Sequence, residues 1–273
     1  MSKQLRIWLF ALLGTLLAST TLPAQGVITM TTSKGAREEI YLRIKANSNV
    51  TIEGAQESGK TDILHRKSYR ITSQTITIRG DVTELDCSDN ELISLNVSKN
   101  TALRALFCGY NQLTSLDVSK NTALTRLDCS NNKLTSLDVS KDTALTRLWC
   151  FGNQLTSLDV SKNTALTTLV CSENQLTSLD VSKNTTLEFL DCSDNKLTSL
   201  NISGCARLEM LFCASNYIKG KAMTKLVNSL PNRRGMSHGT IFPVKFPSGE
   251  MDKNRCSAAD ITTANRKNWK VRQ

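Results

Sequence analysis

Seven of the nine cysteines recur at intervals of 21 residues, and thiols in such a series could form disulfides, bind a metal or act as nucleophiles. Each of the seven stands two residues after a leucine, as in Leu127-Asp-Cys129. Residues two apart on a strand share a face, so the thiols must enter the core with the leucines. We therefore expect buried free thiols that act as small apolar side chains. The series is Cys87, Cys108, Cys129, Cys150, Cys171, Cys192 and Cys213.

Disulfide and metal chemistry do not suit this series. Neighbouring strands lie ~4.8 Å apart and in-register Cβ atoms keep that spacing, whereas a disulfide needs Cβ atoms about 3.8 Å apart. A structural zinc site needs four ligands that converge on one ion at ~2.3 Å, which a straight row does not provide. Cys205 and Cys256 lie outside the series, so a disulfide between them stays an open alternative. We expect no metal and no cofactor.

The sequence offers little for catalysis. Its two histidines, His65 and His238, fall in different terminal segments, and neither stands in a nucleophile motif. No G-x-S-x-G, H-E-x-x-H or phosphate-binding loop occurs. Buried thiols are unreactive, because a nucleophilic cysteine needs partial exposure and a lowered pKa. We therefore predict that the protein is not an enzyme.

The cysteines belong to a 21-residue repeat that occurs seven times between residues 81 and 218. Each copy has leucine at its first position, cysteine at its third, asparagine at its sixth and leucine or isoleucine at its eighth. This spacing predicts a leucine-rich-repeat solenoid, which is mostly β with a parallel stack of strands. Asparagine at a turn can bind backbone groups that the bend leaves unpaired. These asparagines are Asn90, Asn111, Asn132, Asn153, Asn174, Asn195 and Asn216.

A solenoid needs caps at both ends, because the terminal repeats would otherwise expose the core. Residues 27–80 alternate apolar and polar side chains around Ile40 and Leu42, which predicts a small antiparallel β cap of about five strands. Residues 219–273 predict an α+β cap. We expect its helices at 221–230 and from 257 to about 267, and its strands at 240–246 and near Trp269.

The first 26 residues are typical of a secretory signal peptide. Lys3 and Arg6 precede an apolar run at residues 7–18, and small residues follow. We expect cleavage between Ala24 and Val27. The run is shorter than the ~20 residues that span a bilayer, and no later stretch is apolar enough. The prediction is export to an extracellular, cell-surface or periplasmic location, without a membrane span.

The repeats vary most at the positions that flank the leucine and cysteine of each strand, which face outward. Aromatic and arginine side chains occur there, and these types are enriched at binding hot spots. Trp149 and Phe151 should form one patch flanked by arginines, since adjacent repeats lie ~4.8 Å apart. The alternatives are scattered surface aromatics, or packing of Met210 and Phe212 under the C-terminal cap. The predicted concave-face site is Phe107, Tyr110, Arg126, Asp128, Arg147, Trp149, Phe151, Phe189 and Phe212.

Cysteine in the strand, the 21-residue spacing and the phrase Leu-Thr-Ser-Leu-Asp-Val-Ser-Lys-Asn resemble the cysteine-containing repeats of internalin J and its bacterial relatives. The resemblance covers residues 82–218. It implies a secreted or surface-attached protein, and several such proteins are implicated in adhesion to host cells or in biofilms. The two ends of the chain resemble the caps of exported repeat proteins from Gram-negative gut and oral anaerobes. A Leu-Pro-x-Thr-Gly sorting signal is absent, so wall attachment is not carried over.

Charge is distributed unevenly along the chain. Residues 219–273 carry 12 basic and 3 acidic side chains, whereas residues 81–218 carry 11 and 16. Nucleic-acid binding needs a basic stripe along a defined face, so the net acidic array predicts no nucleic-acid partner. The basic end is interpreted as a solvated cap surface.

The outward patch and the resemblance favour a secreted or cell-surface protein-binding module. Its partner would be a protein or a surface glycan, on a host cell among others, and its role adhesion or cell-cell interaction through the concave face. The alternative is a structural envelope or biofilm-matrix protein that acts by self-association. The fold does not name the ligand.

Overall fold

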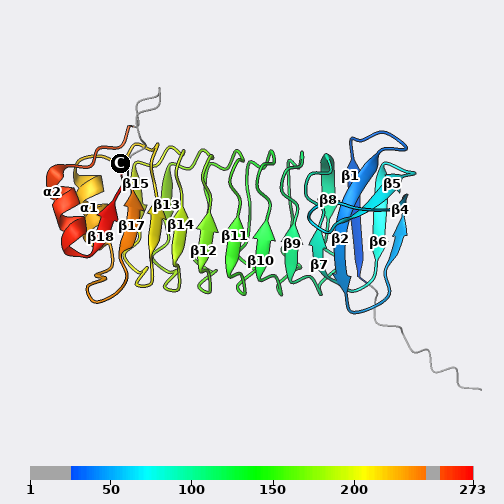
Figure 1. Ribbon diagram of the computed structural model, residues 1–273, viewed down its shortest axis with the longest axis horizontal. Helices are drawn as coiled ribbons and strands as arrows, with labels where there is room; N and C mark the ends of the chain where they lie inside the picture. The colour runs from blue at the N-terminus through cyan, green and yellow to red at the C-terminus, as the bar shows by residue number, and fades with distance from the viewer. Residues whose placement is uncertain (1–25, 244–252, 273) are drawn as a thin grey trace, which may run out of the picture.

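The computed structural model describes residues 26–243 and 253–272. The molecule is elongated: a β module forms one end, the repeats run along its length, and helices with two strands close the other end (Figure 1). Within the described residues one long sheet of twelve strands joins the three parts, in the order β18-β17-β16-β14-β12-β11-β10-β9-β7-β2-β5-β4. The predicted signal peptide lies outside the described residues apart from Gly26.

Antiparallel strands form the N-terminal module. In β2 the side chains of Ile40 and Leu42 are buried between two sheets, while Tyr41 and Arg43 face the other way. One sheet has the order β3-β6-β1-β8, and the other is the N-terminal end of the long sheet. The described residues before 80 contain six strands rather than about five, because β4 pairs with β5 although its polar sequence lacks apolar alternation. The strands are β1 (Val27–Thr32), β2 (Glu39–Ala46), β3 (Thr51–Glu53), β4 (Ala55–Thr61), β5 (Lys67–Ile71), β6 (Thr75–Arg79) and β8 (Leu92–Asn96).

Short parallel strands, one from each repeat, form the middle of the long sheet and confirm the predicted solenoid. Successive strands pair residues that are 21 apart, so Leu127 lies beside Leu148 and Asp128 beside Trp149. Because the repeats are equal in length, side chains at one repeat position form a straight column. These strands are β7 (Val82–Asp86), β9 (Ala105–Phe107), β10 (Arg126–Asp128), β11 (Arg147–Trp149), β12 (Thr168–Val170), β14 (Phe189–Asp191) and β16 (Met210–Phe212).

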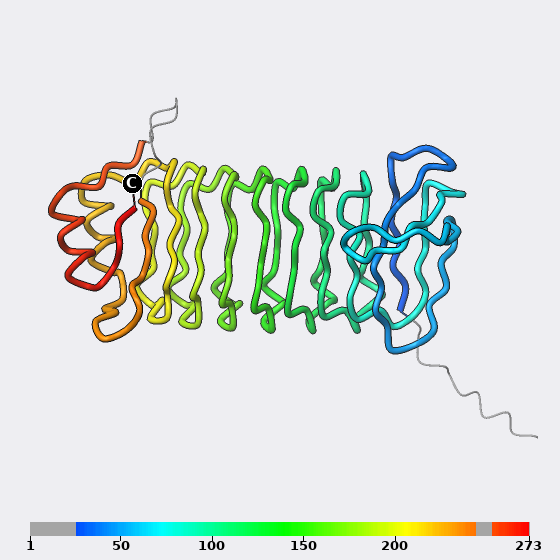
Figure 2. Tube along the Cα trace, viewed as in Figure 1, coloured from blue at the N-terminus to red at the C-terminus, as the bar shows by residue number. Residues whose placement is uncertain are grey.

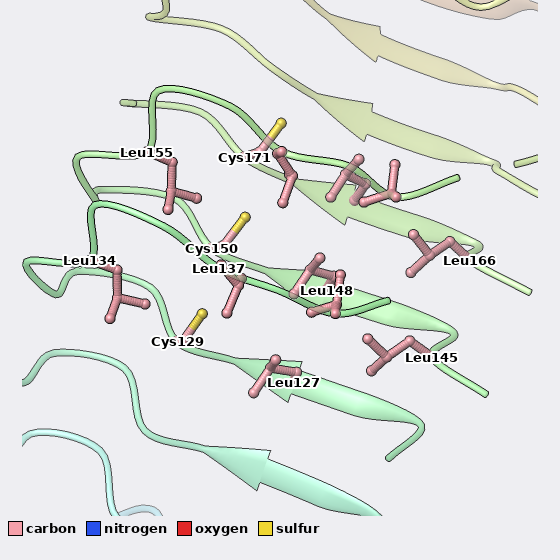
Figure 3. Packing of buried hydrophobic residues seen from close by; sticks show 14 of the residues in the cluster. Leu127, Cys129, Leu134, Leu137, Leu145, Leu148, Cys150, Leu155, Leu166 and Cys171 are labelled. Carbon is pink, nitrogen blue, oxygen red and sulfur yellow. The ribbon is translucent and has the colours of Figure 1, made fainter. Parts of the chain in front are cut away.

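The leucines and cysteines of the repeats pack into one continuous core (Figure 3). Leu127, Cys129 and Leu134 have no exposed surface. Burial raises the pKa of six ladder thiols, from Cys87 to Cys192, because a thiolate would lose its hydration there. The nine cysteines, all within the described residues, form no disulfide, so the alternative of a bond between Cys205 and Cys256 is wrong.

The asparagine at the end of each repeat strand links neighbouring turns. Asn132 Nδ2 donates to the carbonyl oxygens of Cys108 and Cys129, at 3.0 and 3.1 Å. Its Oδ1 accepts a bond from the Leu113 amide nitrogen at 2.9 Å. We call this series the asparagine ladder, and its first rung, Asn90, binds the backbone of β2 instead of a preceding repeat. Each rung therefore satisfies backbone groups of its own turn and of the turn before it.

The segment after each ladder asparagine returns along the wall opposite the long sheet. Among the described residues the repeats have two strands on this wall after β8: β13 (Ser178–Asp180) and β15 (Ser199–Asn201). A second row of side chains closes these turns. In it, Asn163 Nδ2 donates to the carbonyl oxygens of Val139 and Asp142, both at 2.9 Å. This second turn row is Asn100, Asn121, Asp142, Asn163, Asn184 and Cys205.

The C-terminal cap continues the sheet and covers its end. Ser257 and Asp260 form a capping box at the start of the second helix. Trp269 is buried, and its Nε1 donates to the Pro231 carbonyl oxygen at 2.8 Å. The strand predicted over residues 240–246 ends at Phe242, and residues 244–246 lie outside the described part. The elements are α1 (Lys221–Ser229), β17 (Gly239–Phe242), α2 (Ala258–Arg266) and β18 (Trp269–Val271).

Candidate functional site

The outward side of the long sheet from β7 to β17, which we call the sheet face, holds the residues predicted to bind a ligand. Its central column stands between the leucine and cysteine positions. Trp149, for example, is partly exposed between the fully buried Leu148 and Cys150. The strand register sets the neighbours in this column, which is Asp86, Phe107, Asp128, Trp149, Val170, Asp191, Phe212 and Phe242.

An ionic network occupies the N-terminal end of the sheet face. Glu84 Oε2 accepts from Lys45 Nζ and from Arg126 Nη2, both at 3.1 Å, and Arg43 lies 3.3 Å from Asp86. The Arg126 guanidinium also lies over the Phe107 ring, 5.5 Å from its centroid. Arg126 stands on the strand next to that of Trp149, but its guanidinium pairs with Glu84, two repeats earlier, so its charge is not available beside Trp149 as Arg147's is. Glu84 was not among the predicted site residues.

The middle of the sheet face carries Trp149, Phe151 and Arg147. Both rings are partly exposed, and Arg147 is exposed without an ion pair to any described residue. Asp128 in the adjacent strand does not pair with Arg147, since its Oδ1 accepts from Ser130 Oγ at 2.5 Å. Aromatic surface therefore adjoins an uncompensated positive charge at this point. Tyr110, two repeats earlier at a strand end, is 60% exposed.

Three phenylalanines lie toward the C-terminal cap, Phe212 and Phe242 in the central column and Phe189 in the column beside it. The Phe189 and Phe212 rings are tilted with centroids 5.5 Å apart, and Phe212 stacks on Phe242 at 4.5 Å. β17 of the cap extends the sheet beside β16, so Phe212 packs against a ring of the cap, as the alternative expected, while Met210 is 45% exposed on the sheet face. Sequence reasoning missed Phe242, although its Thr-Ile-Phe segment repeats the alternation of Met210-Leu-Phe212.

A fixed turn between β4 and β5 stands at the N-terminal end of the sheet face and was also missed. Ile63 is 95% exposed at its tip. The turn is closed by Asp62, whose Oδ1 accepts from the amide nitrogens of Leu64 and Arg66 at 2.9 and 2.8 Å. Arg66 is buried and also donates to the Ser88 carbonyl oxygen, so the turn reaches back to the first repeat (Figure 2). In the sequence, this turn is indicated by two adjacent aliphatic residues, Ile63 and Leu64, that follow the turn-forming Asp62.

The chemistry of these residues suits non-covalent recognition. No group of three or more potential ligands among the described residues could hold a metal ion. The ladder thiols are buried, and burial raises the pKa of the six from Cys87 to Cys192, which suppresses nucleophilic attack. His238 Nδ1 lies 2.9 Å from Asn268 Oδ1 in the C-terminal cap, while His65 lies in the β4–β5 turn at the other end. Within the described ranges, none of the helices is both long and apolar enough to cross a bilayer.

Family models described as Leucine Rich repeats (2 copies) and Leucine Rich Repeat match residues 101–142 and 186–214. No curated protein matches the chain. Among solved structures, an internalin C2 from Listeria monocytogenes is similar over 70% of this chain and 81% of its own, at 18% identity with a TM-score of 0.53. At this identity the likeness concerns the fold.

Two further solved structures align with lower TM-scores. The functional domain of InlJ from Listeria monocytogenes, which includes a cysteine ladder, aligns over 74% of this chain and 56% of its own, at 24% identity and a TM-score of 0.35. A leucine-rich-repeat protein from Leptospira interrogans aligns over 65% and 50%, at 19% identity and a TM-score of 0.43. The chain spans about half the length of these two structures. The repeat geometry, the family models and the internalin C2 likeness show that this chain has a leucine-rich-repeat fold like that of an internalin.

Proposed function

We propose that the protein is an exported binding module that attaches to a protein or glycan on a cell surface through the middle of its sheet face. The observation that carries this proposal is the partly exposed pair Trp149 and Phe151 beside the unpaired Arg147. The repeat core does not require these residues, because other repeats have Asp, Val or Ser at the equivalent outward positions. Aromatic and arginine side chains contribute most of the binding energy at many interfaces.

The surrounding sheet supports a rigid site. Trp149 stands on a strand that is paired on both sides, with β10 and β12. Its neighbours Leu148 and Cys150 are fixed in the core. Side chains held in this way lose little conformational freedom on binding, which favours affinity. The network around Glu84 differs, since its charges already satisfy one another and are expected to contribute less.

The test is the binding of purified residues 26–273 to epithelial cells, compared between wild type and a Trp149→Ala/Phe151→Ala variant. We expect saturable binding by wild type and at least roughly tenfold weaker binding by the variant, as hot-spot truncation produces. A Thr156→Ala/Ser157→Ala variant is the matched control, since both residues are exposed on the opposite wall of the same repeat. Circular dichroism of all three proteins checks the fold.

Each outcome separates the candidate functions. Equal saturable binding by wild type and the aromatic variant would move the site to a cap and contradict this assignment. Absence of saturable binding, with concentration-dependent assembly in light scattering, would replace it with the self-association role in an envelope or matrix. Unfolding of the aromatic variant would contradict the outward placement of Trp149.

A further inference from the structure

Several cations of the N-terminal module form ion pairs with nearby carboxylates. Lys60 lies 3.1 Å from Glu39, and Arg79 lies 3.0 Å from Glu53. Hydrogen bonds from Lys60 and Arg79 lower the pKa of these two carboxyls, which is consistent with stable pairing. Arg37 and Arg70 are exposed and form no ion pair with a described residue, so the compensation at this end is partial.

The exposed lysines on the opposite wall of the repeats are also compensated. Lys120 and its counterparts in later repeats each stand three residues after an exposed aspartate such as Asp117. Hydrogen bonding by Ser119 and, to a smaller extent, the charge of Lys120 lower the pKa of the Asp117 carboxyl. Positive and negative side chains alternate along this wall, which is the usual pattern of a solvated face.

The C-terminal cap departs from both patterns. Asp260 is the one carboxylate among its described residues, and it is buried in the capping box of α2. Buried Arg233 pairs with Glu209 of the last repeat. The remaining cations have no counterpart of this kind. Six of them are exposed and form no ion pair with a described residue: Lys219, Lys221, Lys225, Arg266, Lys270 and Arg272.

An apolar side chain projects from the same cap. Met236 is 65% exposed in the turn between α1 and β17. The turn is fixed, since Met236 donates its amide hydrogen to the Arg233 carbonyl and Asn268 Nδ2 donates to the Met236 carbonyl, at 3.0 Å in each case. Arg234, two residues before, donates to the Arg266 carbonyl oxygen at 2.8 Å. The exposed methionine is thus held close to Arg234 and Arg266.

We propose that the C-terminal cap binds the surface of an anionic lipid bilayer, end-on, with Met236 entering the headgroup region. Lysines and arginines near such a surface add favourable electrostatic energy, and an apolar side chain among them adds interfacial burial. The cations of α1 and α2 lie at the blunt end of the molecule, where the two helices pack (Figure 1), while Lys270 of β18 lies on the outward side of the long sheet beside Thr240. A blunt end of this kind matches a broad charged surface.

Other polyanions fit this end less well. Single-stranded nucleic acid is usually held by exposed aromatic rings on which bases stack. Of the aromatic residues described in the cap, Trp269 is buried and Phe242 lies on the sheet face. Four strands (β12, β14, β16 and β17) separate β18 from the strand of Trp149 in the long sheet, so this second surface is independent of the ligand proposed for Trp149.

The experiment is co-sedimentation of residues 26–273 with vesicles of phosphatidylcholine that contain roughly one third phosphatidylglycerol, a charged surface of the kind that attracts basic segments. Residues 1–25 are omitted because their apolar run could itself enter a bilayer. The cap variant carries Lys221→Gln, Lys225→Gln, Arg266→Gln and Lys270→Gln. The matched control carries Lys120→Gln, Lys141→Gln, Lys162→Gln and Lys183→Gln, which removes equal charge from the repeats.

We expect wild type to bind these vesicles, to ignore vesicles of phosphatidylcholine alone and to dissociate as salt rises. The cap variant should bind at least roughly tenfold more weakly, while the control variant binds as wild type does. Met236→Ser should weaken binding without changing its salt dependence. Equal loss in both quadruple variants would reduce the effect to net charge and overturn the proposal. Binding to heparin without binding to vesicles would overturn it in favour of an anionic polysaccharide.

Discussion

Asp142 is the one carboxylic acid in the second turn row, where four other repeats have asparagine. At the equivalent position, Asn163 donates two hydrogen bonds to carbonyl oxygens of the preceding repeat. An ionised carboxylate has no hydrogen to donate. Asp142 is fully buried, and both of its carboxylate oxygens lack a partner among the described residues. Burial, with smaller contributions from the charges of Asp138 and Asp117, raises the pKa of this carboxyl to about 7.

This raised pKa makes stability depend on pH in a defined direction. The unfolded chain releases the Asp142 proton near its ordinary pKa of about 4, whereas the folded chain retains it up to about 7. The contribution of Asp142 to stability is therefore fully present below about pH 4, falls as pH rises toward about 7, and then stays constant. Asp142→Asn should remove this loss, because its amide can donate to Val118 and Asn121 as the other asparagines do.

We expect Asp142→Asn to increase the free energy of unfolding by roughly 2–4 kcal/mol at pH 8 and by much less at pH 4.5, from the size of the pKa difference. Urea unfolding at the two pH values measures this. Asp159→Asn is the control, since Asp159 is the exposed equivalent of Asp138 in the next repeat and its Oδ1 accepts from the Ser161 amide at 2.8 Å. A gain for Asp142→Asn that is equal at both pH values would refute the role of ionisation.

Whereas Asp142→Asn should raise stability, replacement of Asn132 in the asparagine ladder should lower it. Replacing Asn132 by alanine leaves the Leu113 amide and several turn carbonyls without their partner. Each unsatisfied buried group costs about 1–3 kcal/mol, so Asn132→Ala should lower stability by at least that amount. Chemical denaturation measures the loss. Thr135→Ala, at an exposed position in the same repeat, should change stability little, and equal stability of Asn132→Ala and wild type would contradict the ladder geometry.

At the scale of elements, the 21-residue period and the composition of the repeats were enough to predict the solenoid. Leucine and cysteine two residues apart identify the inward face, and equal repeat lengths fix the register of β10 beside β11. Local periodicity could not identify β4, whose polar residues become a strand only by pairing with β5. The direction of Arg126 depends on Glu84, 42 residues earlier, and no sequence pattern encodes such a long-range pair. Phe242 joins the central column only because β17 continues the repeat stack.

The C-terminal cap depends on close packing between two of its strands. A Cβ atom at Gly239 would lie 2.5–2.7 Å from ring atoms of Trp269. Gly239→Ala should therefore separate β18 from β17 and destabilise the cap by roughly 1–3 kcal/mol, the usual cost of overpacking. Hydrogen exchange should quicken in β17 and β18 and stay unchanged in β10 and β11. Thr240→Ala, at the next position on the sheet face, should leave both regions as in wild type.

Across the whole molecule, strand pairing and the asparagine ladder join adjacent repeats, so stability is carried from repeat to repeat. Ladder asparagines donate within their own turn and the preceding one, and each strand pairs with the next at a constant offset. An internal copy can therefore be removed without creating a new kind of junction. The two caps differ, because each provides contacts found nowhere else in the described chain, such as the bonds of Asn90 to β2.

Deletion of Leu169–Phe189, one full repeat, should give a folded protein with native circular dichroism and a modest loss of thermal stability. Thr168 would then precede Leu190, and the cysteine and asparagine positions would stay aligned. Deletion of residues 169–178 is the control, because it removes about half a repeat and places outward residues in the core. Misfolding of the full-repeat deletion, with a folded half-repeat deletion, would contradict nearest-neighbour stacking.

The constant strand spacing also fixes the distance between the two ends of the molecule. One end carries the Ile63 turn and the other carries the cations around α2, and the repeats between them hold the two apart. Each additional copy moves the ends apart by ~4.8 Å, without a change in sequence at either end. The number of repeats therefore sets how far a ligand on the sheet face stands from whatever surface the C-terminal end touches, so copy number alone could tune that reach.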